Sequence, residues 1–399
     1  MTRTSRAART ALWSKHDQEW RNPAQVVSQW RDAAAVDPRL LRYTTRGAWW
    51  DTLAASGVTL LISREYEHLV VAMRADRDGP ALSYMPLPHP SGIAYDRARA
   101  TVYVASTRNP NQIYDLMAVN AVLPGRDRPC ASLPKRALVP VRSRFYPGCL
   151  YMHDLAMIGG TLYVTAVGQN TVASVVDGGR FEPAWWPRCI DTSAGPIVDR
   201  NFIQLNSIAA GHDLNGSFFS ASAAAIGRRR PGHRNFPVDR RGVIFSGRTR
   251  EPIATGLTRP HSARLAGGRL WVNNSGYGEV GIVDGGRFVP VRRLPGWTRG
   301  LCVYRQIAYV GTSGVIPAFR HHAPGLRLED SVCGIHAVDI RSGRSLGSLI
   351  WPYGNQVFTI EWVPPEFTTG FPFTTPSSAE RPQTLGLFYA FQTTNGVKA

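Results

Sequence analysis

Two histidines stand at the same position of a repeated sequence unit, and histidine side chains can bind metal. His153 opens "HDLAMIGGTLYVTAVGQNTVASVVDGGRFEP", and His261 opens "HSARLAGGRLWVNNSGYGEVGIVDGGRFVP". A catalytic zinc ion takes three protein ligands and leaves one position open. Zinc in such a site lowers the pKa of a bound water or polarises a substrate oxygen. The pattern predicts a metal-assisted site if the fold brings the histidines together.

The elements that would hold these histidines are short β-strands. Apolar residues alternate in both units, and Gly-Gly pairs mark tight hairpins. Related stretches recur in tandem, which indicates a repeat fold whose four-stranded blades take about 40–50 residues each. We therefore predict an all-β protein, a six-bladed β-propeller. Its six units begin at what we term the strand-start residues: Ser91, His153, Asn206, His261, Arg299 and Phe358.

In a propeller, the innermost strand of each blade lines a central channel, so the strand-start residues should meet at one mouth. We predict His153 and His261 as ligands of a divalent metal, zinc or calcium. His89, which precedes Ser91 by two residues, is the third candidate ligand. Asp154 follows His153 directly and could orient that ligand through a second hydrogen bond.

Three further residues complete the predicted site. Arg299 offers a fixed cation for a substrate carboxylate. Asn206 could bind substrate or join an oxygen-rich ion site, and Ser91 could also contact substrate. We thus predict Arg299, Asp154 and Asn206 as catalytic residues. In the alternative interpretation, the histidines only hydrogen-bond the backbone of their own turns, and the propeller is a non-catalytic scaffold for protein–protein interaction.

The chain divides into three predicted parts around this propeller. Residues 1–50 have helix-start signals at Asn22-Pro23 and Asp37-Pro38 and form an N-terminal helical extension. Residues 51–365 form the propeller, which we expect residues 58–76 to close by pairing with "VFTIEWVP". The segment 313–334 is an insertion and a candidate lid. The Pro/Thr/Ser-rich residues 366–399 form an irregular tail.

The composition narrows the choice of partners. The net charge is +18, and arginines are concentrated in "RRRPGHRNFPVDRR" at 228–241. This segment contains a single aromatic residue and no RNA-recognition pattern, so we expect an acidic partner there, not nucleic acid. Five cysteines without a C-x-x-C pair speak against a disulfide framework. No secretory signal or membrane-spanning run is evident, which predicts a cytoplasmic protein that contacts no membrane.

Several segments resemble a known bacterial family. They are "PLPHPSGIAYD", "MHDLAMIGGTLYVTAVG", "TRPHSARLAGGRLWVNNSGYGEVGIVD" and "LPGWTRGLCVYRQIAYVGTS". The chain is similar, over roughly residues 50 to 365, to a conserved hypothetical propeller family known as a domain of unknown function. The resemblance implies a six-bladed propeller related to the NHL and strictosidine-synthase-like groups, without an established activity.

A looser similarity connects "RPHSARL" with the peptidyl-hydroxyglycine lyase propeller, in which three histidines hold zinc. By that resemblance His153, His261 and His89 would be ligands and Arg299 a substrate anchor. The resulting expectation is a channel site that binds or transforms a small molecule or a modified peptide, as a lyase or hydrolase would. The sequence leaves open whether the protein is an enzyme.

Overall fold

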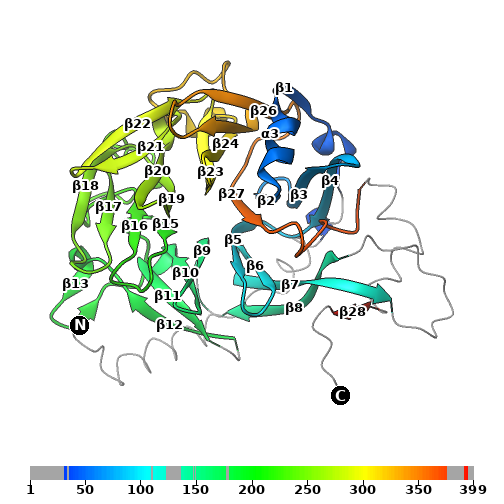
Figure 1. The fold of residues 1–399 in the computed structure, drawn as a ribbon. Coiled ribbons are helices and arrows are strands. Elements are labelled where there is room, and N and C mark those ends of the chain that lie inside the picture. Colours follow the sequence, from blue (N-terminus) through cyan, green and yellow to red (C-terminus); the bar gives the residue numbers. More distant parts are fainter. Residues whose placement is uncertain are drawn as a thin grey trace.

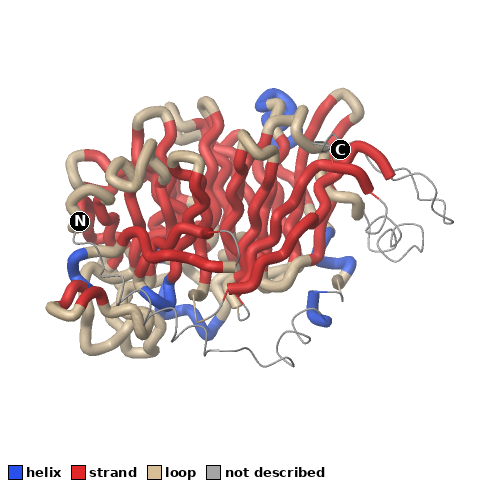
Figure 2. The backbone as a smooth tube through the Cα atoms, turned by 90° about the horizontal axis from the view of Figure 1, so that it is seen from below, coloured by secondary structure: helices blue, strands red, loops and turns tan. Residues whose placement is uncertain are grey.

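The computed structural model describes residues 31–33, 36–108, 111–122, 136–146, 148, 150–176, 179–374 and 391–393. In this part of the chain, four-stranded antiparallel sheets surround a central axis as six blades (Figure 1). The predicted six-bladed β-propeller is therefore confirmed. Seen edge on, the strands stand side by side and the loops gather at the two ends (Figure 2).

The blades follow one another along the chain, each running from an inner to an outer strand. The second blade contains β5 (Pro90–Asp96), β6 (Thr101–Ser106), β7 (Asn111–Val122) and β8 (Ala137–Tyr146). The third contains β9 (Met152–Ile158), β10 (Thr161–Ala166), β11 (Thr171–Val176) and β12 (Arg180–Trp185). The fourth contains β15 (Leu205–Ala209), β16 (Phe218–Ala221), β17 (Gly242–Ser246) and β18 (Pro252–Leu257).

The fifth blade, which begins at His261, carries the sequence repeat that it shares with the third, and the sixth blade follows it. The fifth contains β19 (Pro260–Ala266), β20 (Arg269–Asn274), β21 (Glu279–Asp284) and β22 (Arg287–Arg293). The sixth contains β23 (Trp297–Tyr304), β24 (Ile307–Ser313), β25 (Cys333–Asp339) and β26 (Ser345–Trp351). Both Gly267 and Gly268, which connect β19 to β20, have positive φ angles of 56° and 71°. A two-residue hairpin of type I′ requires this backbone conformation, which explains the Gly-Gly pairs.

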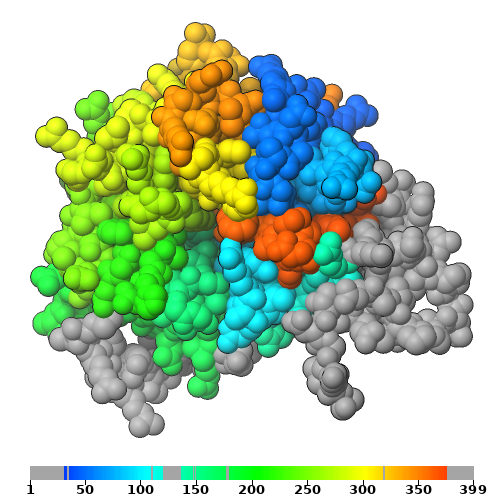
Figure 3. All heavy atoms as spheres, in the orientation of Figure 1, coloured from blue at the N-terminus to red at the C-terminus, as the bar shows by residue number. Residues whose placement is uncertain are grey.

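The first blade combines the two ends of the propeller. Its inner strand is β27 (Thr359–Val363), and its outer strands are β2 (Thr59–Arg64), β3 (Leu69–Asp76) and β4 (Gly79–Pro86). β2 pairs with β27 in antiparallel register, from Thr59 opposite Val363 to Ser63 opposite Thr359. In the space-filling view the C-terminal segment (orange) lies against the N-terminal strands (blue) (Figure 3). The predicted closure of the ring is confirmed.

Neighbouring blades share apolar layers, so the core is distributed around the ring. Between the third and fourth blades, Trp185 packs on Phe219 with ring centroids 4.0 Å apart, and Ile208 and Phe245 belong to the same buried cluster. Packing of this kind between sheet faces follows from the alternation of inward and outward side chains along each strand. It fixes the positions of the inner strands relative to one another.

The ends of the chain differ in part from the sequence-based expectation. Residues 1–30, most of the predicted helical extension, lie outside the described residues. The described remainder includes η1 (Pro38–Leu41), α3 (Trp49–Ser56) and a strand, β1 (Thr44–Gly47), which pairs with β26 as a fifth strand. The predicted irregular tail contains a strand, β28 (Phe391–Thr393), which pairs with β7.

Short elements occupy the connections. They are η2 (Val167–Gln169), η3 (Arg188–Ile190), η4 (Ser275–Tyr277), η5 (Pro317–His322) and the small pair β13 (Asp191–Thr192) and β14 (Gly195–Pro196). No helix among the described residues is long and apolar enough to span a bilayer.

Gly92 on β5 provides a test of how closely the inner strands approach one another. A Cβ at this position would lie 2.7 Å from the Cα of Asp154 on the next blade. We expect Gly92→Ala to lower the free energy of unfolding by about 2–4 kcal/mol, because backbone atoms must move to relieve the clash. Gly227→Ala, whose new Cβ would meet nothing closer than 3.6 Å, is the control. Chemical denaturation measures both, and equal stability of the two variants would contradict the prediction.

Candidate functional site at the channel mouth

All six strand-start residues lie where the repeat predicts, at the beginning of the innermost strands. Ser91, His153, Asn206, His261 and Arg299 belong to β5, β9, β15, β19 and β23, and Phe358 directly precedes β27. In each of the first five strands, the pairing register with the neighbouring strand shifts close to the strand-start residue. Such β-bulges bend a strand and redirect its side chains, here at the mouth of the channel.

A pocket of about 110 Å³ opens at this mouth, enough for several waters or a small organic molecule. Of the strand-start residues, His153, His261 and Arg299 line it. The other lining residues are Glu65, Tyr66, Tyr151, Gln204, Arg259, Trp297, Ser313, Gly314, Ile316, His322, Asn355 and Gln356. The structure thus brings together three of the residues predicted from the sequence.

Five lining residues share a position that the sequence reasoning missed. Each precedes a strand-start residue by two, and we call them the mouth set: Tyr151, Gln204, Arg259, Trp297 and Gln356. Three of them, Tyr151, Gln204 and Arg259, have positive φ angles of 52°, 50° and 54°. This conformation is strained for bulky residues and is often retained at functional sites. Aligning the repeats and examining the position two residues before each strand-start residue would have identified the mouth set.

His261 presents an unprotonated nitrogen to the pocket. Its Nδ1 lies 2.8 Å from the carbonyl oxygen of Arg259, which can only accept, so Nδ1 carries the proton and donates. The Ser275 hydroxyl, 3.0 Å from the same nitrogen, itself donates to the Thr298 carbonyl. Burial lowers the pKa of His261 well below its usual value, and the Arg299 charge adds to this. The ring is therefore neutral at pH 7, with its lone pair on Nε2.

His153 is a second buried imidazole of the site. Its ring lies nearly parallel to that of His261, with centroids 6.5 Å apart, and meets Tyr151 and Phe358 at 4.7 and 5.4 Å. Neither ring nitrogen hydrogen-bonds to a described residue. Burial and then the Arg299 charge lower the pKa of His153 well below its usual value. With His322, whose pKa is lowered to about 3 by burial and then by the Arg259 charge, the pocket lining contains three neutral imidazoles.

Arg299 is held by an aromatic ring and an amide. Its guanidinium carbon lies 3.6 Å from the centroid of Phe358, and Nη1 is 2.9 Å from the side-chain oxygen of Gln356 in the orientation that satisfies the amide. The amide nitrogen of Gln356 then donates to Glu65 at 3.0 Å. Burial raises the pKa of Glu65, while the Arg299 charge opposes the rise.

Two of the predicted residues connect blades and do not line the pocket. The Ser91 hydroxyl donates to the carbonyl of Met152 at 2.8 Å, and the Asn206 amide donates to the carbonyl of Pro260 at 2.9 Å. Both acceptors belong to the inner strand of the following blade. Their predicted contact with substrate therefore has no support from the pocket geometry.

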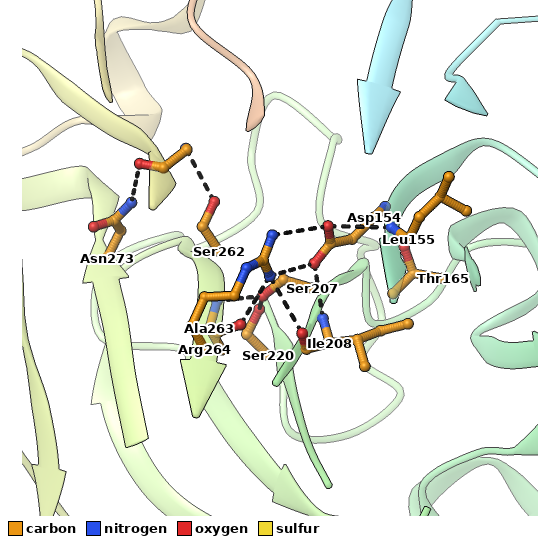
Figure 4. Close-up of polar contacts among 11 residues, drawn as sticks. Asp154, Leu155, Thr165, Ser207, Ile208, Ser220, Ser262, Ala263, Arg264 and Asn273 are labelled. Atoms are coloured by element: carbon orange, nitrogen blue, oxygen red, sulfur yellow. Dashed lines mark hydrogen bonds and ion pairs between the residues drawn. The ribbon is translucent and has the colours of Figure 1, made fainter. Parts of the chain in front are cut away.

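Asp154 has a similar inter-blade role (Figure 4). Its carboxylate accepts from Arg264 Nη1 at 2.7 Å and Nη2 at 3.1 Å, and from the backbone N–H of Ile208 at 3.0 Å. Because both carboxylate oxygens are engaged with the fourth and fifth blades, Asp154 does not orient His153, contrary to the expectation from the sequence. The carboxylate instead ties the third blade to the fourth through Ile208 and to the fifth through Arg264.

His89 lies apart from the other two candidate metal ligands. Its backbone N–H donates to Nδ1 of His68, the two rings lie 4.3 Å apart, and the residue does not line the pocket. Within the described ranges, no three His, Cys, Asp or Glu side chains are grouped so that they could hold a metal ion. Of the three predicted ligands only His153 and His261 line the pocket, and two histidines do not match the three protein ligands of a catalytic zinc.

The predicted lid segment, 313–334, forms part of the pocket wall. It connects β24 to β25 and supplies Ser313, Gly314, Ile316 and His322. His322 Nε2 lies 3.3 Å from Nη2 of Arg259. Because β23 starts at the mouth and β24 returns to it, this segment lies on the same face as the strand-start residues.

A family model described as a domain of unknown function (DUF4915) matches residues 47–369. The chain belongs to this family. The resemblance predicted from roughly residues 50 to 365 is thereby confirmed, and the match covers all six blades. Among curated proteins, none matches the sequence.

Solved structures show distant likenesses to this DUF4915 protein. A nidogen/laminin complex matches with a TM-score of 0.49 and 10% identity, over 77% of this chain and 98% of that one. A putative 6-phosphogluconolactonase from Bacteroides uniformis has a TM-score of 0.44 and 11% identity, over 77% and 99%. A gluconolactonase from Xanthomonas campestris has a TM-score of 0.43 and 12% identity, over 74% and 86%. Likenesses at this level say nothing about function.

Buried neutral histidines make the stability of the DUF4915 protein depend on pH. His336, between the hydroxyls of Thr312 and Ser348, has its pKa lowered to about 4 by burial and, secondarily, by Arg292 and Arg46. Below pH 6.5 the unfolded chain protonates this residue while the folded protein does not, so stability falls as pH drops from 6.5 towards 4.

We therefore expect His336→Gln to reduce the loss of unfolding free energy between pH 7 and 5 by up to about 2 kcal/mol, the contribution of one proton. Urea denaturation of both proteins at a series of pH values measures the difference. Parallel pH profiles would show that His336 is protonated equally in the folded and unfolded states.

Proposed function

We propose that the channel-mouth pocket binds a small molecule and transforms it by general acid–base chemistry, as a hydrolase or lyase would. The observation that carries the proposal is the state of His261: a neutral ring, fixed by two hydrogen bonds at Nδ1, with Nε2 left to accept a proton. A general base needs such a nitrogen within hydrogen-bond reach of substrate. Proton transfer of this kind contributes about 10²–10⁴-fold to a rate.

The other groups suit supporting roles in the proposed reaction. Buried Arg299 provides a positive charge to hold or stabilise an anionic group, and its position is fixed by Phe358 and Gln356. His153 lies beside His261 and offers a second neutral imidazole. Trp297, 6.2 Å from His261 between centroids, supplies an apolar wall. The proposal routes no step through a metal.

Comparative metabolite profiling tests this proposal although the substrate is unidentified. Wild-type protein and His261→Gln are incubated with a small-molecule extract, and the mixtures are compared by mass spectrometry. We expect compounds that wild type consumes at rates at least 10²-fold above those of the variant. His212→Gln, at an exposed histidine away from the pocket, is the matched control. Equal turnover by wild type and His261→Gln would refute the role of His261.

A second candidate function, binding of an acidic peptide, has its own structural observation. The loop between β16 and β17 lies on the mouth face and forms a groove of about 590 Å³. Ala223 and Val243 are buried in its floor, with Ile226 and Phe236 half-buried. Its rim consists of Arg228, Arg229, Arg240 and Arg241, all exposed and none in an ion pair with a described residue. An apolar floor with a basic rim suits an acidic segment that carries an apolar side chain.

Reversing the charge of the groove arginines tests peptide binding without altering the channel-mouth pocket. We expect Glu substitution of the four rim arginines to weaken binding of a labelled Glu-rich peptide at least tenfold, and the wild-type affinity to fall with added salt. The control carries the same charge change on the opposite face, at four exposed arginines: Arg180, Arg269, Arg287 and Arg305. Fluorescence anisotropy measures both variants, and equal affinities would exclude the groove as the binding site.

A further inference from the structure

Arg259 is a buried cation without a carboxylate partner. It is 6% exposed, and none of its contacts with described residues is acidic. Nη1 donates to the side-chain oxygen of Gln204 and to the Ser222 hydroxyl at 3.2 Å, and Nη2 lies 3.3 Å from Nε2 of His322. Its Nε is buried and has no hydrogen-bond partner among the described residues.

Such a residue is costly to keep inside a protein. Arginines are almost never fully buried unless they are paired, because the desolvated charge is then uncompensated. Burial accordingly lowers the pKa of Arg259 to about 10, and the charge of Arg299 contributes to the shift. The backbone of Arg259 adds a further cost, since its φ of 54° is strained for a residue with a Cβ. A bound anion would offset the charge.

The charges around the pocket indicate what kind of anion fits. Arg259 and Arg299 both line it, whereas Glu65 is the one carboxylate among the lining residues. Glu65 is linked to Arg299 through Gln356 and also lies 3.8 Å from Arg108 Nε, so its charge is shared between two guanidinium groups. The pocket therefore keeps a net positive charge, with no carboxylate at Arg259, and this charge suits a bound anion.

We propose that the pocket holds the carboxylate of a small organic acid at Arg259, with Arg299 on the opposite side of the bound molecule. The inference deepens the proposed function, on which it rests, by naming the substrate class. A guanidinium binds a carboxylate through two parallel hydrogen bonds, which fixes the orientation of the molecule. The Nη2 of Arg259 exchanges His322 for the ligand, and the adjacent Nε, which has no partner among the described residues, supplies the second donor. The rest of the molecule then lies beside His153, His261 and Trp297.

The test uses acetate as the carboxylate probe, acetamide as its neutral counterpart and inorganic phosphate as the competing anion. Binding is measured by calorimetry at constant ionic strength, together with the melting temperature. We expect acetate to bind saturably, acetamide not to bind, and phosphate to bind at least tenfold more weakly than acetate. Absence of saturable acetate binding would overturn the proposal, and preference for phosphate would overturn the carboxylate assignment.

Arg259→Met distinguishes an anion site from a structural arginine. If the charge is kept for a ligand, its removal should weaken acetate binding at least tenfold while the melting temperature of the free protein stays equal or rises. A purely structural arginine would instead give a lower melting temperature and unchanged binding. Arg259→Lys keeps the positive charge but cannot make two parallel hydrogen bonds to a carboxylate. We expect this variant to fold and to bind acetate at least threefold more weakly than wild type. Arg269→Met, at an exposed arginine on the other face, should change neither quantity.

The His261→Gln variant distinguishes failure of the catalytic proposal from failure of the anion-site proposal. Its acetate affinity should stay within about threefold of wild type, because the anion contacts Arg259 and the Gln amide can still donate to the Arg259 carbonyl, as His261 Nδ1 does. Acetate binding that survives in His261→Gln together with unchanged turnover would refute the catalytic proposal and leave the anion site standing. Unchanged acetate binding in Arg259→Met together with turnover lost in His261→Gln would refute the anion site alone.

Discussion

The antiparallel pairing of β27 with β2 is the interaction on which the rest of the structure depends. It joins residues 359–363 to residues 59–64, nearly 300 positions away, and converts a row of sheets into a ring. A row would leave two unpaired edges, which closure removes. Closure also decides the distances at the channel mouth, because the rings of His153, from the third blade, and Phe358, from the closing segment, lie 5.4 Å apart. The pocket exists only in the closed ring.

Hydrogen bonds between successive inner strands give this ring its rigidity. Ser91 connects the second blade to the third, and Asn206 connects the fourth to the fifth. Asp154 of the third blade accepts from Ile208 of the fourth and pairs with Arg264 of the fifth (Figure 4). These residues occupy the same repeat positions as the pocket residues or the positions beside them. The strand-start position therefore has two roles. In some blades its side chain hydrogen-bonds the following blade, and in others it lines the pocket. Rigid support of this kind is what a precisely arranged site needs.

The fold was predictable from the sequence because the repeat is expressed in local residues. Gly-Gly hairpins, alternating strands and matching strand starts at His153 and His261 indicated six blades, a closing pair and a channel. The site was predictable only in part. Asn206 and Asp154 have the residue types of a functional site, yet their partners, Pro260 and Arg264, are fixed by packing between blades that sequence spacing does not reveal. Arg259 was missed because its approach to the pocket depends on a positive φ angle, which residue type does not indicate.

Ring closure also sets an order of events during synthesis. Domains fold as their segments emerge, from the N-terminus onward. Five blades can form before β27 is complete, but Gln356 and Phe358, which hold Arg299, arrive only with the last segment of the propeller. Until then Arg299 lacks both the amide and the aromatic ring that hold it. A nascent chain interrupted before residue 356 would thus contain the strands of five blades and still lack the complete pocket.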